Sequence, residues 1–469
     1  MTRDRLSFLY LNIGHFLDHL LTLVFATVAA LALTREWGLS YAELVPYAMP
    51  GFVAFGLFSL PAGRLADRWS RHGMMIVFFI GIGLAAIAAG FAQTPLQMAG
   101  LLLVVGILAA IYHPVGLAMV VGSIGTAVAQ GPGAKSNGYS SMLLAVVAAA
   151  ALVPLSLSVG GGYIVPVVVA VLIGLAVYVP TGTGMAIAVN GVWGNLGVGS
   201  AALITGWFID HGGWRSAFVV PGVLSVAVGL AYWWHVRDDL RLARSGAAAA
   251  PAQPKAAATS SSAAGMSAEA RAAFVRLTAI VFFTTAVSSL VFQSTTFALP
   301  KVFDERLGGI AGSATVIGWM AFMVFAIASL AQLVVGRLLD TIGPRTVFMV
   351  AAALQLVFFA IMPGFRDWPA LAIALGFMLG AFGQIPINDY MIGRMAKSEH
   401  RATVYGVRYV VSFSVLAAAL PLIAWIHGNW GFDVLFRVLA VAAGLILIAV
   451  SMLPRSIPEG GAAATPARA

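Results

Sequence analysis

The chain has no cysteine among its 469 residues, and only 9% of its residues carry a formal charge. Without cysteine the protein forms no disulfide, and thiol catalysis and thiolate metal sites are excluded. A soluble globular chain is about a quarter charged and about half apolar. This chain is 61% hydrophobic, with a mean hydropathy of +0.96. The composition excludes an ordinary soluble domain and indicates a helical integral membrane protein, because a helix satisfies its own backbone hydrogen bonds in lipid.

Fourteen apolar runs come close to the length of a membrane-spanning helix, which is about 20 residues. They cover residues 6–33, 43–63, 73–92, 96–122, 140–159, 162–181, 185–209, 214–235, 274–300, 312–336, 345–363, 368–393, 403–427 and 432–453. The polar stretch Arg237 to Arg271 contains the low-complexity run Ala247–Gly265 and cannot bury a core. We therefore expect an N-terminal helical bundle over 1–236, a flexible cytoplasmic linker over 237–271, a C-terminal bundle over 272–455 and a disordered tail over 456–469.

The two halves read as repeats of one another until the fourth apolar run. His113 to Gly191 is 78 residues, whereas the corresponding distance from Gln384 to Gly406 is 22 residues. The N-terminal half thus carries 78 − 22 = 56 additional residues, which correspond to Ser123–Gly182 with its two apolar runs. A pair of spans preserves the orientation of everything that follows. We predict an inserted helical hairpin at about 123–182, either spanning the membrane or lying in it as a re-entrant hairpin.

The net charge of +9 is explained by basic residues in alternate loops. Lys and Arg are held in short cytoplasmic loops. The richer loops carry Arg3, Arg5, Arg64, Arg68, Arg71, Lys135, Arg237 to Arg244, Arg337, Arg345, Arg394 to Arg401 and Arg455. The poorer loops carry Arg35, Arg215, Lys301, Arg306 and Arg366. We expect both termini and the linker to be cytoplasmic, Met1 to Arg5 to lead into the first span and not a removable signal, and no nucleic-acid partner.

Two charged loops between apolar runs share one pattern. The first reads Gly-Arg-Leu-Ala-Asp-Arg-Trp-Ser-Arg-His over 63–72, and the second reads Gly-Arg-Leu-Leu-Asp-Thr-Ile-Gly-Pro-Arg over 336–345. Both have Gly-x-x-x-Asp followed by Arg after a short gap. The residues that form the pattern are Gly63, Asp67, Arg68 and Arg71 in the first loop and Gly336, Asp340 and Arg345 in the second.

This pair of loops resembles the signature of the major facilitator superfamily of secondary transporters, which usually reads Gly-x-Leu-x-Asp-Arg-x-Gly-Arg-Arg. Ser70 stands in place of its second Gly, and Thr341 stands where the first copy has Arg68. The resemblance implies an all-α membrane protein with a twelve-helix core of two six-helix halves, up to 14 membrane segments with the hairpin. It also implies that the two loops act as gating loops, which hold the halves together in one state of the transport cycle.

Ionisable side chains inside apolar spans are costly, so each one is a candidate site residue. His15, Asp18 and His19 lie in the first run at spacings that place them on one helical face. His113 is followed by Pro114 in the fourth run, and bent helices commonly line transport sites. A histidine beside a carboxylate titrates near neutral pH. We predict that these residues and Asp389 carry protons, while a structural His–Asp hydrogen bond is the alternative.

The remaining polar residues of the spans are candidates for substrate binding. They are Asn195, Gln293, Gln384, Asn388, Arg408 and Tyr409. Asp389 lies one turn after Pro386, and we expect it to form a buried pair with Arg408, since each would otherwise be stranded in a low dielectric. That pair is either a gate or a structural link.

The histidine motif around Gly14, the Tyr112-His113-Pro114 corner, the Gly194–Gly197 stretch and Trp214-Arg215 resemble the fosmidomycin-resistance branch of the superfamily. The resemblance implies proton-coupled export of a small molecule by alternating access, with no enzymatic activity, no cofactor, no resident metal, a location in the inner (plasma) membrane and a monomeric state. One alternative is an importer of a transition metal such as copper, with His15, His19, His113 and the thioethers of Met185, Met391 and Met395 as ligands. A remote alternative is an intramembrane metalloenzyme built on the same histidines.

Overall fold

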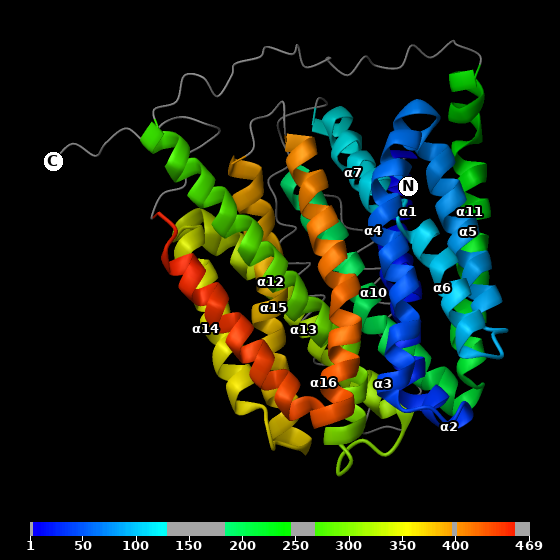
Figure 1. Cartoon of the computed structure of the whole chain (residues 1–469). Helices are drawn as coiled ribbons and strands as arrows, with labels where there is room; N and C mark the ends of the chain where they lie inside the picture. The colour runs from blue at the N-terminus through cyan, green and yellow to red at the C-terminus, as the bar shows by residue number, and fades with distance from the viewer. Residues whose placement is uncertain (1–2, 129–182, 245–267, 396–400, 455–469) are drawn as a thin grey trace.

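The computed structural model describes residues 3–128, 183–244, 268–395 and 401–454, and Figure 1 shows them as a set of long helices. The elements of the N-terminal part are α1 (Arg3–Val28), η1 (Ala29–Leu33), α2 (Thr34–Glu36), α3 (Tyr41–Leu44), η2 (Val45–Ala48), α4 (Met49–Arg68), α5 (Arg71–Ala89), α6 (Pro95–Ala109), α7 (Tyr112–Val128), α10 (Thr183–His211) and α11 (Trp214–Arg244). Those of the C-terminal part are α12 (Ala268–Arg306), α13 (Ala314–Thr341), α14 (Pro344–Ile361), α15 (Asp367–Met395) and α16 (Arg401–Ser451).

Eleven helical segments of the described residues are long and apolar enough to cross a membrane. The last of them is two helices joined at Gly431, whose φ of 74° breaks α16 and turns the chain back. Glycine adopts this positive φ without the strain that a Cβ would add. Counting α16 as two gives twelve crossings, which confirms the predicted all-α twelve-helix fold. Residues 129–182 of the predicted hairpin lie outside the described residues, and 123–128 continue α7.

Helix ends are fixed locally by side-chain caps. The Ser40 hydroxyl accepts a hydrogen bond from the Glu43 N–H at 3.3 Å, and the Ser40 N–H donates to the Glu43 carboxylate at 2.8 Å. This capping box starts α3. Ser70 caps α5 in the same way through the N–H of Gly73 at 3.0 Å. The cap separates α4 from α5 with a two-residue link, and the basic loop is therefore placed at one end of the molecule.

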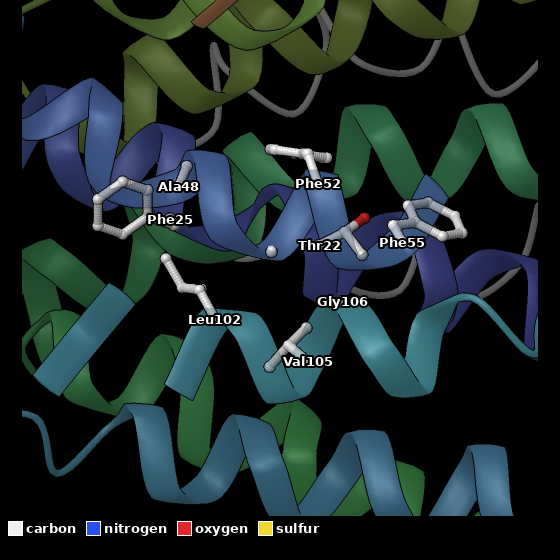
Figure 2. A pocket seen from close by; sticks show the side chains of 9 residues that line it. Thr22, Phe25, Ala48, Phe52, Phe55, Leu102, Val105 and Gly106 are labelled. Carbon is white, nitrogen blue, oxygen red and sulfur yellow. The ribbon is translucent and has the colours of Figure 1, made fainter. Parts of the chain in front are cut away.

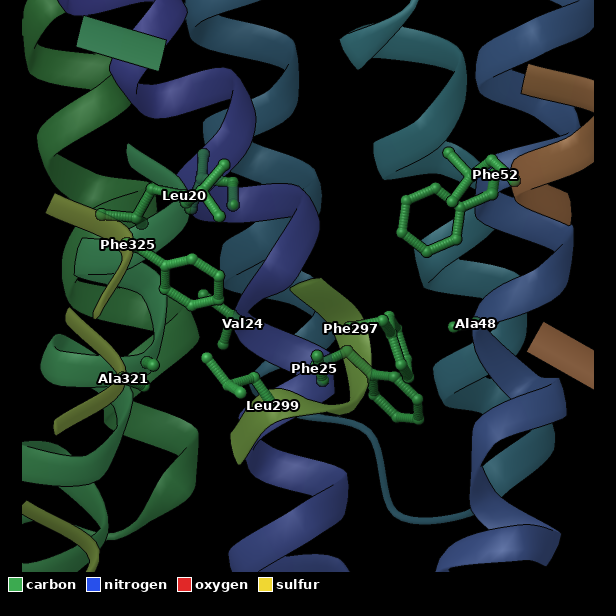
Figure 3. Packing of buried hydrophobic residues seen from close by; sticks show 14 of the residues in the cluster. Leu20, Val24, Phe25, Ala48, Phe52, Phe297, Leu299, Ala321 and Phe325 are labelled. Carbon is green, nitrogen blue, oxygen red and sulfur yellow. The ribbon is translucent and has the colours of Figure 1, made fainter. Parts of the chain in front are cut away.

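The helices pack as two bundles that meet along two seams (Figure 1). In the N-terminal bundle α1 packs on α10, α4 on α6, and α5 on α11. In the C-terminal bundle α12 packs on α16, α13 on α15, and α14 on both α15 and α16. The seams between the bundles are α10 with α13 and α4 with α16. One buried apolar cluster runs through both bundles, and Figure 3 shows Phe25 and Phe52 of the first beside Phe297 of the second.

The α10–α13 seam is tightest where α10 ends and α13 begins. A Cβ at Gly206 would collide with the carbonyl oxygen of Ala314, and a Cβ at Gly318 would collide with that of Ala202. The two backbones are in direct contact there, as small residues allow in membrane helices. At the same end of the molecule, a Cβ at Gly428 would lie 3.0 Å from the Cβ of Ala42.

A carboxylate closes this end of the seam. Asp210 on α10 accepts hydrogen bonds from the Thr315 N–H at 2.7 Å, the Thr315 hydroxyl at 2.5 Å and the Ala314 N–H at 3.3 Å. These are the first residues of α13, where the N–H groups lack partners within the helix. A negative charge is favoured at that positive end of the helix dipole. One bundle therefore caps a helix of the other.

We expect Asp210→Ala to lower the free energy of unfolding by about 1 kcal/mol, as loss of a helix cap does. The measurement is the midpoint of thermal unfolding of the purified protein in detergent. Asp238→Ala is the matched control, because Asp238 is 63% exposed and lies only near Arg237 and Arg241 of its own helix. Equal midpoints for the two variants would contradict the cap.

Candidate functional site

The candidate site begins at the break between α6 and α7. α6 ends at Ala109, and α7 starts at Tyr112 with Pro114 in its first turn. Proline has no N–H to continue the hydrogen-bonding of the preceding turn. The bend predicted from Pro114 is therefore present, and it places Tyr112 and His113 at the start of a new helix.

Two histidines face this helix from α1. His15 and His19 are one turn apart, with ring centroids 5.0 Å from each other. Nδ1 of His15 lies 2.7 Å from the backbone oxygen of Asn190 on α10, so this nitrogen carries the proton and donates it. Nε2 of His15 then lies 3.2 Å from Nε2 of His19. The predicted histidine face of the first span is turned toward α7 and α10.

His113 and Asp18 complete the group. The ring centroid of His113 lies 5.3 Å from that of His15 and 5.4 Å from that of His19. Nε2 of His113 is 3.4 Å from Oδ2 of Asp18, whose side chain is fully buried. Oδ1 of Asp18 has no hydrogen-bond partner among the described residues. The structure therefore brings together four of the five predicted proton carriers, and we call His15, Asp18, His19 and His113 the histidine cluster.

Polar contacts among three helices hold the cluster in place. The Tyr112 hydroxyl donates to the backbone oxygen of Leu11 at 2.7 Å. The side-chain amide of Asn190 donates to Asn12 and to the Tyr112 hydroxyl, each at 3.0 Å. A buried network in which the polar groups have hydrogen-bond partners is rigid. This network fixes α1, α7 and α10 relative to one another and with them the orientation of His15.

Glycine on α10 gives the His15 ring its space. A Cβ at Gly194 would lie 2.5 Å from Nε2 of His15. A Cβ at Gly191, one turn earlier, would meet only Oε1 of Gln332 on α13, at 3.7 Å. The absence of a side chain at Gly194 therefore leaves room for the His15 ring, whereas Gly191 lies on the seam between the bundles.

The C-terminal bundle contacts the cluster through an aromatic ring. Phe413 on α16 lies 4.5 Å from Phe55 on α4 and 6.2 Å from His113, measured between ring centroids. Phe55 also lies 5.6 Å from His113. Beside it lies a pocket of about 20 Å³. Figure 2 shows residues that line it, among them Thr22, Phe52 and Phe55. That volume is close to the room needed by one water molecule.

The predicted substrate residues are spread over both bundles. Asn195 is buried next to Gly194, and its Nδ2 has no hydrogen-bond partner among the described residues. Gln384 is buried on α15 and donates to Gln355 on α14 at 2.9 Å. Asn388 lies buried one turn further along α15, and Gln293 is half-buried on α12.

Asp389, the fifth predicted proton carrier, is half-buried on α15. Its expected partner Arg408 and the adjacent Tyr409 lie on α16, but their side chains are outside the part of the chain that the structure describes. The predicted pair of Asp389 with Arg408 therefore stays a prediction.

The two charged loops lie at helix ends, as their sequences predict. Nη2 of Arg71 forms an ion pair with Oδ1 of Asp67 at 2.8 Å, and Arg68 is exposed beside it. A Cβ at Gly63 would lie 3.2 Å from Pro114. In the second loop Arg345 donates to the backbone oxygen of Ser451 at 2.6 Å. Gly336 has open space around it, and the side chain of Asp340 is outside the described residues.

Several contributors were absent from the sequence-based prediction, among them Gln355, Phe413 and Asp210. Gln355 is a fully buried polar residue within an apolar helix, and the cost of such a residue in a span was a signal that could have identified it. Phe413 carried no signal, because it is one of 28 phenylalanines. Asp210 lies at a helix end, where carboxylates are common. The sequence therefore contains no sign that it caps α13.

The cluster also has the composition of a metal site. His15, His19 and His113 each present one ligand nitrogen, and these nitrogens all lie within 4.8 Å of one another. The thioether of Met391 does not belong to this group, because it is fully buried in a separate apolar cluster with Leu277, Ile280 and Val281. The side chains of Met185 and Met395 are outside the part of the chain that the structure describes, so the mixed imidazole and thioether set expected for copper stays a hypothesis.

Comparisons with known proteins agree with the fold. The model of the Major Facilitator Superfamily matches residues 281–468. The gallate transporter of Pseudomonas putida is 25% identical over 211 residues, which are 45% of this chain and 35% of that transporter. The chain is therefore aligned with about a third of this relative's length.

Among solved structures, a bacterial homologue of the human lysosomal transporter Spinster, in an inward-facing and unoccupied conformation, is 14% identical with a TM-score of 0.62. The match covers 96% of this chain and 94% of that one. It shows a shared fold, namely the major facilitator fold with the twelve crossings described above. The fosmidomycin-resistance branch stays a prediction.

Substituting the two glycines of α10 separately tests whether the His15 ring needs the space at Gly194. We expect Gly194→Ala to lower the stability by about 1–3 kcal/mol, because it overpacks a filled interior. Gly191→Ala has room for its methyl group and should be neutral or stabilising by up to about 1 kcal/mol. Thermal unfolding of both variants in detergent checks this. The site geometry is wrong if Gly194→Ala is tolerated as well as Gly191→Ala.

Proposed function

We propose that the protein is a proton-coupled secondary transporter of the major facilitator superfamily, which moves a small molecule across the membrane by alternating access. One observation carries the proposal. A fully buried carboxylate, Asp18, lies among three imidazoles inside a twelve-helix membrane fold. Ionisable groups at such a depth are expensive and typically mark an ion pathway. The family match over 281–468 and the transporter relatives support a transport function over an enzymatic one.

Proton binding at the cluster would change its net charge. Asp18 lies 3.4 Å from Nε2 of His113, and removing one partner of a buried ion pair leaves a charge that costs several kcal/mol. Taking up or releasing one proton therefore shifts the balance between two packings of the bundles. Phe413 gives the C-terminal bundle a direct contact with His113. The fifth predicted proton carrier, Asp389, provides a titratable carboxylate in the C-terminal bundle.

We further propose that the substrate is a small polar organic molecule bound between the bundles by Asn195, Gln293, Gln384, Asn388, Arg408 and Tyr409. The 25% identity to a gallate transporter supports a small organic substrate. Nδ2 of Asn195, which has no hydrogen-bond partner among the described residues, could donate to such a molecule on the N-terminal side. Gallate is the first compound to test.

The orientation follows from the basic residues. Arg3 at the start of α1 pairs with Asp239 near the end of α11 at 2.8 Å, so the start of α1 and the end of α11 share one end of the molecule with the loop 63–72 (Figure 1). We propose that this basic end is cytoplasmic, in the inner membrane. The end closed by Asp210 then faces outward. We propose export as the direction of transport, with the two charged loops gating the cytoplasmic side and the protein acting as a monomer.

The test uses purified protein in proteoliposomes with gallate as the probe. An imposed pH gradient should drive gallate transport by the wild type, and Asp18→Asn should reduce transport to the level of protein-free vesicles, because the amide cannot exchange a proton. Asp239→Asn is the matched control and should retain the response, since Asp239 is 39% exposed at the surface. Transport that ignores the pH gradient, or an Asp18→Asn variant that responds like the wild type, would contradict proton coupling.

A further inference from the structure

The nitrogen atoms of the histidine cluster are arranged as a set of metal ligands. Nε2 of His15 and Nε2 of His19 are 3.2 Å apart. Two imidazoles bound to one metal at about 2.0–2.1 Å in tetrahedral geometry have their nitrogens about 3.3 Å apart. His113 supplies a third nitrogen within 4.8 Å of both. This is the only group of three such residues that the described part of the chain contains.

The groups that contact these imidazole rings are of the kinds that orient metal-ligating histidines. A ligating histidine almost always donates its other N–H to a backbone carbonyl or a carboxylate. Nδ1 of His15 donates to the backbone oxygen of Asn190, which leaves Nε2 with its lone pair facing His19. Asp18 lies 3.4 Å from His113 and is placed to orient that ring. The arrangement therefore has an inner group of nitrogens and an outer group of oxygens.

The neighbours of the three rings restrict their orientation and leave one of them partly exposed. Gly194 keeps a side chain away from Nε2 of His15, where any Cβ would lie at 2.5 Å. Tyr112 stacks on His15 at 4.9 Å, and Phe55 covers His113, so the rings have little freedom to turn away. The side chain of His113 is 18% exposed, so the cluster is not sealed on every side.

We propose that His15, His19 and His113 form a binding site for one divalent cation of the late first-row series, the class of cobalt, nickel, copper(II) and zinc. Imidazole nitrogen suits these ions, whereas magnesium and calcium require oxygen ligands. Asp18 orients His113 and balances one of the two positive charges. The site goes beyond the proposed transport of a small molecule, and it stands on the geometry of the cluster whichever substrate the protein carries.

The experiment measures binding and not transport. The purified full-length protein in detergent is titrated with Co²⁺, whose visible absorption reports tetrahedral nitrogen coordination, and Zn²⁺ is then added in competition. One equivalent of Co²⁺ should bind and be displaced by Zn²⁺. His15→Ala, His19→Ala and His113→Ala should each weaken binding by about 100-fold or more, and Asp18→Asn by about 10- to 100-fold.

His211→Ala is the matched control, because His211 is an exposed histidine at the end of α10 whose ring contacts the Trp207 backbone oxygen. It should bind Co²⁺ like the wild type. His19→Gln preserves a polar side chain for the case in which an alanine variant fails to fold, and it should also lose the absorption. Wild type without a cobalt spectrum, or cluster variants that bind as tightly as His211→Ala, would overturn the site. A positive titration together with transport that ignores a pH gradient would instead overturn the proposed function alone.

Discussion

The direct contact of α10 with α13 is the constraint on which the arrangement of the two bundles depends. Glycines at 206 and 318 let the backbones touch, and Asp210 caps the partner helix at the same end. Dispersion between close surfaces and hydrogen bonds drive helix association in lipid, where the hydrophobic effect contributes little. A seam of this kind is held by a few polar contacts and close packing. The proposed alternating access requires that such a seam be exchanged for another at modest cost.

The histidine cluster lies within one bundle and yet contacts the other. Asn190, Tyr112 and Asn12 orient the cluster from its own bundle, and Phe413 covers it from the opposite side. A change in the charge of Asp18 and His113 therefore acts on a surface shared by both bundles. The same three imidazoles are also suited to a metal ion, because one nitrogen of each lies within 4.8 Å of the others.

Much of the fold follows from the sequence. Apolar runs of sufficient length predicted the spans, and Pro114 predicted the bend at the fourth of them. The i to i+4 spacing of His15 and His19 predicted a shared face. The structure confirms these predictions where they fall on described residues, since they depend on local geometry, while the runs 140–159 and 162–181 lie outside those residues. The contacts between residues of different helices could not be predicted from the sequence in this way. Nothing in the sequence connects Asp210 with Thr315, Gln384 with Gln355, or His113 with Phe413, because each pair joins helices whose register is set by packing.

A cross-link between the bundles tests the central claim, alternating access, most directly. The chain has no native cysteine, so Ala42→Cys and Gly428→Cys introduce a single pair. Their Cβ positions are 3.0 Å apart, and a slight shift gives the ~3.8 Å of a disulfide. Oxidation should lock this end of the molecule closed and abolish gallate transport in proteoliposomes, and a reductant should restore transport. Undiminished transport by the fully cross-linked protein would contradict the account.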